Sequence, residues 1–290
     1  MSNISLLHRW RDILITAIAP IIWGSTYIVT SEFLPPDRPF TAALIRVLPA
    51  GVLLFLFTRQ FPARHNWWRL LVLSALNIGI FQALLFVAAY RLPGGLAAVL
   101  GAIQPLIVMV LIWAVNGKSP TRLTLVSAIM GVIGMAVLLL SPQTIFEPIG
   151  MAAALLGAAC MATGVWLTRQ WRLSLSLLSL TGWQLILGGL MLAPMAWLID
   201  MPLPVLGIKE WSAYGYLSLA GALLAYVLWF RGIARLPSIA FASLGLLSPL
   251  TAVVLGWVFL SQSITGTALL GLLIVLLSIF AVQWTTVRNQ

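Results

Sequence analysis

Long apolar stretches separated by short polar turns follow one another from end to end of this 290-residue chain. A helix needs about 20 apolar residues to cross a hydrocarbon core, and roughly ten stretches are long enough. Their expected limits are 12–33, 39–58, 69–91, 94–116, 122–141, 147–168, 177–200, 211–231, 237–261 and 265–285. Pro, Gly and Ser, which end helices and begin turns, punctuate the joins. The pattern predicts an all-α integral membrane protein with about ten transmembrane helices.

Two of these stretches, 91–113 and 235–257, resemble each other at a constant offset of about 144 residues. Arg91-Leu92-Pro93 aligns with Arg235-Leu236-Pro237, Leu100-Gly101 with Leu244-Gly245, and Pro105 with Pro249. We interpret the match as an internal duplication, with five spans in residues 1–142 and five in residues 143–290. Since each copy crosses the membrane an odd number of times, the second copy must be inverted. Inverted repeats of this kind enclose the central cavity of many transporters.

The composition excludes a soluble protein and argues against nucleic-acid binding. Apolar residues make up 61% of the chain and charged residues 8%, where soluble domains carry about 25% charged residues. The net charge of +10 comes with no basic run, and we find no basic face studded with aromatic residues, as nucleic-acid binding requires.

The basic residues instead follow the predicted topology. With an even number of spans both termini share one side, and most of the Lys and Arg residues fall there: Arg9, Arg11, Arg59, Arg64, Arg69, Lys118, Arg122, Arg169, Arg172, Arg231, Arg235 and Arg288. The opposite side receives all but one of the six acidic residues. Because cytoplasmic loops attract Lys and Arg, we expect a bacterial-type inner-membrane protein with both termini in the cytoplasm.

The chain offers no set of residues suited to catalysis or to holding a metal. His8 and His65 have no Cys, Asp or Glu partners at metal-binding spacing, and no Walker-type or nucleophile-elbow motif occurs. The single Cys160 excludes an internal disulfide. We therefore expect no enzymatic activity, no metal and no cofactor. The expected partners are a small-molecule substrate and membrane lipid, and no obligate protein partner is evident.

Several short motifs resemble a known group of transporters. Trp23-Gly24-Ser25 lies in the first span, Arg46 in the second, and Leu-Gly-x-x-x-Pro occurs twice, at Leu100–Pro105 and Leu244–Pro249. Together with the duplication, these features resemble the EamA-type branch of the drug/metabolite transporter (DMT) superfamily, and within it the YddG-type exporters of aromatic amino acids. The resemblance implies a ten-helix fold whose central cavity opens alternately to either side. It also implies export of hydrophobic or aromatic metabolites.

Arg46 is the one strong charge placed well within a span. A charge at the membrane centre costs at least about 2.5–3.5 kcal/mol on insertion scales, so the guanidinium needs a partner or an aqueous cavity. Two interpretations stay open. Arg46 attracts the carboxylate of a substrate, or it pairs with Glu32 or Asp37 near the end of its helix.

Other polar and aromatic side chains within the spans complete a candidate binding site. Asn77 and Phe81 lie four residues apart and share a helix face, and Gln82 aligns with Tyr226 in the duplication. Each aromatic residue has the alternative role of packing or facing lipid. The candidate substrate-binding residues are Trp23, Tyr27, Arg46, Asn77, Phe81, Gln82, Gln104, Trp166, Tyr226 and Ser248.

Paired prolines and glycines mark the expected hinges. Gln104 and Ser248 directly precede Pro105 and Pro249, where the proline ring removes a helix hydrogen bond and can free a carbonyl of the preceding turn. Gly101 and Gly245 lie one turn earlier in the sequence. We expect these four Pro and Gly residues to let the helices rock about a central site.

These observations predict a secondary transporter that exports aromatic or hydrophobic amino acids and related metabolites by alternating access. One alternative is efflux of organic cations or other xenobiotics, which the scarcity of acidic residues within the spans disfavours. Another is a membrane scaffold or enzyme without transport activity, which would gain little from an inverted duplication.

Overall fold

The computed structural model describes residues 3–92, 100–117, 119–139, 147–259 and 266–288. Regular secondary structure in these residues is entirely helical. Nine helices of this part of the chain are long and apolar enough to span a membrane, and one further apolar helix, Gln104–Asn116, is shorter. The fold class predicted from the sequence, an all-α integral membrane protein, is confirmed. The start of the predicted span 94–116 lies outside the described residues.

The helices follow one another with short connections, and several are built from consecutive pieces. Their bounds are α1 Asn3–Phe33, α2 Pro39–Thr58, η1 Arg64–Asn66, α3 Trp67–Ser74, η2 Ala75–Gly79, α4 Ile80–Arg91, α6 Gln104–Asn116, α7 Arg122–Leu139, α8 Pro148–Trp171, α9 Leu177–Leu198, α10 Ile208–Ser218, η3 Leu219–Leu224, α11 Ala225–Arg235, α12 Ser238–Leu244, α13 Leu247–Phe259 and α14 Thr267–Arg288.

Local sequence explains where several helices begin and end. Helix α8 starts with Pro148, whose missing N–H costs nothing in the first turn, and the Glu147 carboxylate accepts from Gly150 N at 2.5 Å. The Ser176 hydroxyl caps α9 in the same way by accepting from Ser179 N at 3.2 Å. Helix α6 ends at Gly117, whose φ of +67° is readily adopted by glycine.

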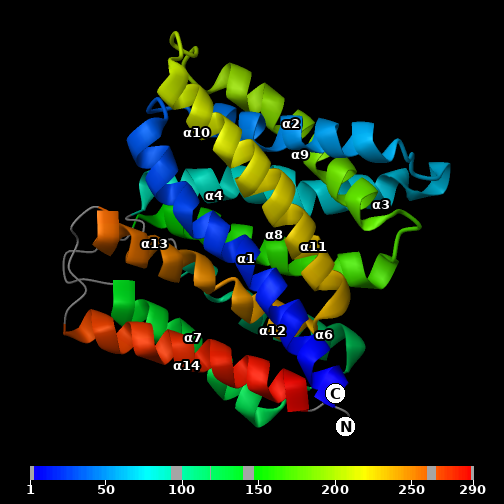
Figure 1. Cartoon of the computed structure of the whole chain (residues 1–290), viewed down its shortest axis with the longest axis vertical. Coiled ribbons are helices and arrows are strands. Elements are labelled where there is room, and N and C mark those ends of the chain that lie inside the picture. The colour runs from blue at the N-terminus through cyan, green and yellow to red at the C-terminus, as the bar shows by residue number, and fades with distance from the viewer. Residues whose placement is uncertain (1–2, 93–99, 118, 140–146, 260–265, 289–290) are drawn as a thin grey trace.

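Five pairs of helices make the main contacts between elements. Helix α2 packs along α9, and α7 packs along α14; Figure 1 shows these pairs toward opposite ends of the molecule. Between them, α4 packs on α8 and α1 packs on both α11 and α13. The first residues of α1 and the last of α14 lie on the same side of the molecule (Figure 1). We call this the terminal side, and the side of residues 34–38 the far side.

Two long helices contain a π-helical turn in the middle. The turn η2 joins α3 to α4, and η3 joins α10 to α11. The two turns begin at Ala75 and Leu219, which have the same separation of 144 residues as Gln82 and Tyr226. A π turn interrupts the regular helix hydrogen bonds and frees backbone groups, and such turns occur often at functional sites.

Two other helices are broken at the positions predicted to be hinges. Residues 102–103 form a turn before α6, and residues 245–246 separate α12 from α13. Tight bonds to the third residue back, such as Ile103 N to Leu100 O and Ser248 N to Gly245 O, hold these turns. Pro105 and Pro249 thus lie in the first turn of a new helix, where a proline removes no hydrogen bond.

Candidate functional site

A cavity of about 730 Å³ lies among α1, α2, α4, α8, α11 and the two broken helices. It reaches the surface at Pro36 and Asp37, which are exposed residues on the far side. The other lining residues lead inward to Trp23, Tyr226 and Gln104. The volume falls within the ~300–1,000 Å³ typical of small-molecule sites. The cavity is therefore a pocket that is open to the far side.

Aromatic rings form much of the inner wall. The Trp23 ring lies 5.1 Å from that of Tyr226 and 5.0 Å from that of Trp229, in tilted and edge-to-face arrangements. Phe81 and Phe86 line the same cavity. Tilted aromatic clusters keep their ring positions while presenting flat apolar surface. This wall suits an aromatic or aliphatic group.

Arg46 supplies the positive charge of the site. Its side chain is 6% exposed, and its Nη2 donates to the carbonyl oxygen of Gly221 at 3.1 Å. The indole Nε1 of Trp23 donates to the same oxygen at 2.9 Å. Gly221 lies within the π turn η3, which explains why its carbonyl is available to side chains. The π turn therefore holds both Arg46 and Trp23 against the cavity.

Gln82 and Tyr226 meet at the inner end of the cavity. The amide Nε2 of Gln82 donates to Tyr226 Oη at 2.7 Å, and both side chains are 1% exposed. The two residues come from the helices that carry the two π turns, at equivalent positions of the proposed duplication. Their bond therefore joins the two halves of the chain directly.

Tyr226→Phe is expected to lower the free energy of unfolding by about 1–3 kcal/mol, because it leaves Gln82 Nε2 buried without its acceptor. The double variant with Gln82→Leu should cost less than the sum of the two single changes, since it removes both polar partners. Unfolding in mixed detergent micelles measures this difference. Strictly additive losses would contradict the coupling.

Most of the predicted site residues lie on this wall. Besides Trp23, Arg46, Phe81, Gln82 and Tyr226, the lining includes Gln104, Ser248, Gly101, Gly245, Pro105 and Pro249. The broken helices bring the last six there, because their turns carry the backbone to the cavity. Most of the predicted polar residues and all four expected hinge residues thus occupy one place in the structure.

Three predicted residues lie elsewhere or cannot be placed. Asn77 is buried behind the cavity and donates to Gln184 Oε1 at 2.8 Å. The indole of Trp166 donates to Asn116 Oδ1 at 3.0 Å, near the terminal end of α8. The side chain of Tyr27 is outside the described residues. The cavity as it stands therefore uses neither Asn77 nor Trp166.

The sequence analysis missed Trp229, Thr30 and Met161, which also line the cavity. Trp229 is 2% exposed and lies three residues after Tyr226, so the two share a helix face. This spacing would have allowed Trp229 to be predicted as a cavity residue from the sequence. Thr30 and Met161 have no comparable signal, because threonine and methionine are ordinary residues of membrane helices.

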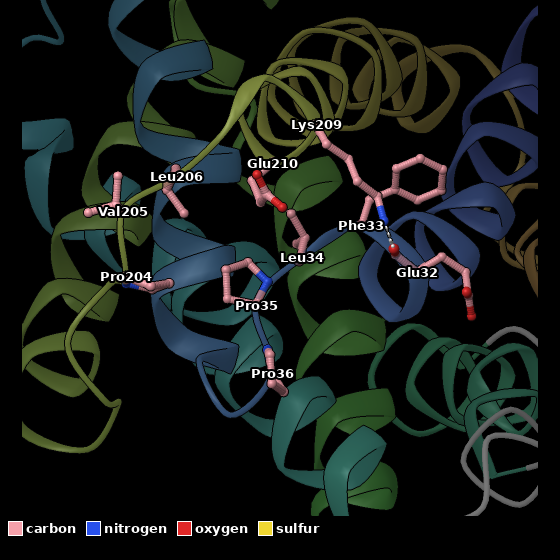
Figure 2. A pocket seen from close by; sticks show the side chains of 10 residues that line it. All are labelled: Glu32, Phe33, Leu34, Pro35, Pro36, Pro204, Val205, Leu206, Lys209 and Glu210. Atoms are coloured by element: carbon pink, nitrogen blue, oxygen red, sulfur yellow. Dashed lines mark hydrogen bonds between the residues drawn. The ribbon is translucent and has the colours of Figure 1, made fainter.

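A second hollow of about 290 Å³ lies on the far side between residues 32–36 and 204–210 (Figure 2). Its charged groups serve the ends of helices: Lys209 Nζ donates to the carbonyl of Glu32 at 2.7 Å, and the Glu210 carboxylate accepts from Gly207 N at 2.8 Å. Leu34, Pro35 and Pro36 line both hollows. The smaller hollow therefore adjoins the entrance of the cavity.

The terminal side of the cavity is closed by contacts between α1 and α11. The Asp12 carboxylate accepts from Arg231 at 2.5 Å and from Arg235 at 3.4 Å. One turn along α1, Thr16 packs directly against Gly232, where any larger residue would clash. These contacts hold together the ends of the two helices that form the inner wall.

A family model described as "EamA-like transporter family" matches residues 10–140 and again residues 148–284. The two matches cover most of the chain. The chain belongs to the EamA-like transporter family. The resemblance to the EamA branch of the drug/metabolite transporter superfamily is thereby confirmed, and the coarse functional prediction of a multi-pass membrane transporter is confirmed with it.

Curated proteins of several organisms are similar to this chain over most of its length. Protein PecM of Dickeya dadantii is 42% identical, over 91% of this chain and 90% of PecM. A chloroplastic WAT1-related protein of Arabidopsis thaliana is 28% identical, over 90% of this chain and 67% of its own length. The uncharacterized inner membrane transporter YedA of Escherichia coli K12 is 26% identical, over 81% and 78%. The family and these names point to a transporter rather than an enzyme.

One solved crystal structure superposes on this EamA-family chain with a TM-score of 0.80, over 97% of this chain and 99% of the other. The two sequences are 18% identical. The likeness therefore establishes the fold and carries no statement about the substrate.

Proposed function

We propose that this protein exports aromatic or hydrophobic amino acids and related metabolites across the cytoplasmic membrane by alternating access. The observation that carries the proposal is the far-side cavity, in which a buried arginine lies beside a cluster of aromatic rings. A carboxylate can pair with the guanidinium of Arg46, while an aromatic or aliphatic side chain packs against Trp23, Tyr226 and Trp229. The resemblance to YddG-type exporters of aromatic amino acids implies the same class of substrate.

Alternating access follows in this proposal from two inverted repeats of five spans each, residues 1–142 and 143–290. The double family match supports it. Helix contacts support it as well. A contact between two helices has a counterpart between the two helices that are their equivalents in the opposite repeats. Contact of α4 with α8 corresponds to contact of α11 with α1, and contact of α6 with α8 corresponds to contact of α13 with α1. The equivalent π turns and the Gln82–Tyr226 bond are further support.

The proposed orientation places the terminal side in the cytoplasm of a bacterial-type inner membrane. The excess of basic residues on this side supports it, and the printed name of the relative YedA places that protein in an inner membrane. The cavity would then be open to the exterior, as expected of an exporter in its releasing state. No nucleic acid or obligate protein partner enters the proposal.

Efflux of organic cations is the alternative within transport. A cation needs a negative partner, and the acidic residue among the described lining residues is Asp37, which is exposed at the entrance. Arg46 repels a cation at the inner end. The cavity therefore favours a substrate with a carboxylate over a cation.

Transport by purified protein in liposomes tests the proposal. We expect labelled tryptophan to cross the membrane, with competition by phenylalanine and leucine and none by serine or by tetraphenylphosphonium. The experiment is repeated with and without an imposed pH gradient to distinguish facilitated diffusion from proton coupling. Tetraphenylphosphonium transport without amino-acid transport would replace the proposal with its alternative.

A further inference from the structure

A compact polar cluster of Asn77, Gln184 and the partly buried Thr168 lies on the terminal side of the cavity, at the π turn η2. Asn77 Nδ2 donates to Gln184 Oε1 at 2.8 Å and to Thr168 Oγ1 at 3.3 Å. Asn77 is 1% exposed and Gln184 is 0% exposed. Asn77 Oδ1 lies directly against Gly164 of α8, where a side chain would displace it. The cluster thus joins η2, α8 and α9.

Two polar atoms of the cluster make no hydrogen bond with the part of the chain that the structure describes: Asn77 Oδ1 and Gln184 Nε2. The first is an acceptor and the second a donor, on neighbouring side chains. Buried polar groups of native proteins nearly always have partners. This acceptor and this donor are therefore free to bind a further group.

The cluster occupies the position that corresponds, in the other half of the chain, to the part of the far-side cavity around Arg46. Asn77 in η2 and Gly221 in η3 are separated by the same 144 residues as Gln82 and Tyr226. In the earlier spans the match between the two halves has a shorter offset, at which residues 46–51 align with residues 184–189: Arg46 and Gln184 are 138 residues apart (184 − 46), and so are Thr30 and Thr168 (168 − 30). Thr30 and Arg46 line the far-side cavity. Their equivalents in the other half come together in the buried cluster.

The cavity residues Thr30 and Arg46 and the cluster residues Thr168 and Gln184 lie at different depths between the two sides of the molecule. Gln184 is near the start of α9 at Leu177, and Thr168 is near the end of α8 at Trp171; both of these helix ends are on the terminal side. Thr30 lies near the end of α1 on the far side. If the halves exchange conformations, the contacts now opened around Arg46 open around Gln184.

We propose that Asn77, Thr168 and Gln184 form a second substrate-contacting site, which lines the cavity when the protein opens to the terminal side. Adjacent Asn77 Oδ1 and Gln184 Nε2 fit a ligand that presents an N–H donor beside an oxygen acceptor, as an ammonium and carboxylate or a carboxamide does. The site is uncharged, whereas the far-side site contains Arg46. The inference deepens the proposed function and rests on its alternating access.

Thiol labelling tests the site without any knowledge of the cargo. In a Cys160→Ala background, Gln184→Cys is exposed to a membrane-impermeant sulfonated maleimide added to one face at a time. We expect modification from the terminal face alone. Adding Asp12→Asn should make it about fivefold faster, because the change weakens the ion pairs that close this side. Thr168→Cys is a second reporter if Gln184→Cys does not accumulate.

The matched control is Thr181→Cys, on the same helix α9 and also 0% exposed but outside the cluster; it should stay unmodified. Equal labelling of Thr181→Cys and Gln184→Cys, or no labelling of either cluster reporter while Thr30→Cys reacts from the far face, overturns the site. Labelling as expected in a protein that does not carry tryptophan would instead remove the proposed substrate and leave the site in place.

Discussion

Arg46→Gln is expected to reduce the transport efficiency for tryptophan by about 10- to 100-fold, the largest functional effect that we predict. Hydrogen bonds to charged groups contribute about 1.5–3 kcal/mol, and each 1.4 kcal/mol corresponds to a factor of ten. The loss should be confined to substrates with a carboxylate. Tryptophanamide, which keeps the indole and replaces the carboxylate, should be transported almost as well by the variant as by the parent protein. Initial rates in proteoliposomes measure both.

Arg46→Lys is the matched control for this experiment. Lysine keeps the positive charge but lacks the planar fork that reaches both Gly221 O and a carboxylate. We therefore expect an intermediate rate for tryptophan. If Arg46→Gln lowers the amount of protein in the membrane and leaves the transport of tryptophan per molecule unchanged, Arg46 has a structural role and the carboxylate site is refuted.

Gly271→Ala is expected to cause the largest loss of stability. Helices α7 and α14 cross here so closely that a Cβ on Gly271 would lie 2.7 Å from the carbonyl oxygen of Gly134 and would also contact the backbone of Leu138. Backbone atoms cannot rotate aside, so the helices must separate. Overpacking costs typically about 1–3 kcal/mol, and we expect the upper end of this range. Thermal unfolding of the purified protein in detergent measures the loss.

Gly215→Ala is the corresponding control in helix α10, where a Cβ meets nothing within 4 Å. Alanine is favoured over glycine within a helix by about 0.5–1 kcal/mol, so this variant should unfold at the same or a higher temperature. A Gly271→Ala protein as stable as Gly215→Ala would mean that the α7–α14 crossing is looser than the structure shows.

The helices were predictable from the sequence because lipid imposes a length and a polarity on them. The limits predicted for 39–58 agree with α2 at both ends, since Pro39 begins the helix and Arg59, with φ of 47°, ends it. The π turns were not predictable. Ala75–Gly79 and Leu219–Leu224 have the same apolar composition as their surroundings, and an inserted residue in a helix leaves no mark on hydropathy.

The candidate site was predictable where polar residues are rare. Arg46, Gln82 and Gln104 stand out in apolar spans, and all three line the cavity. Asn77 stands out equally but lies in the buried cluster, because a polar residue in lipid needs some partner and the sequence does not say which. Trp229 was harder to recognise. Tryptophan is common in membrane helices, and its place on the wall depends on packing with Trp23.

The hydrogen bond between Gln82 and Tyr226 has a consequence for the history of the chain. If two identical ancestral subunits once met across a two-fold axis, the residue at this place faced a copy of itself. An amide facing a phenol is a mixed pair, which such a symmetric dimer cannot form. On this view the present bond arose after the ancestral gene had been duplicated and its two copies could mutate independently. The mixed pair then gave each half a different partner residue, so one half could no longer replace the other.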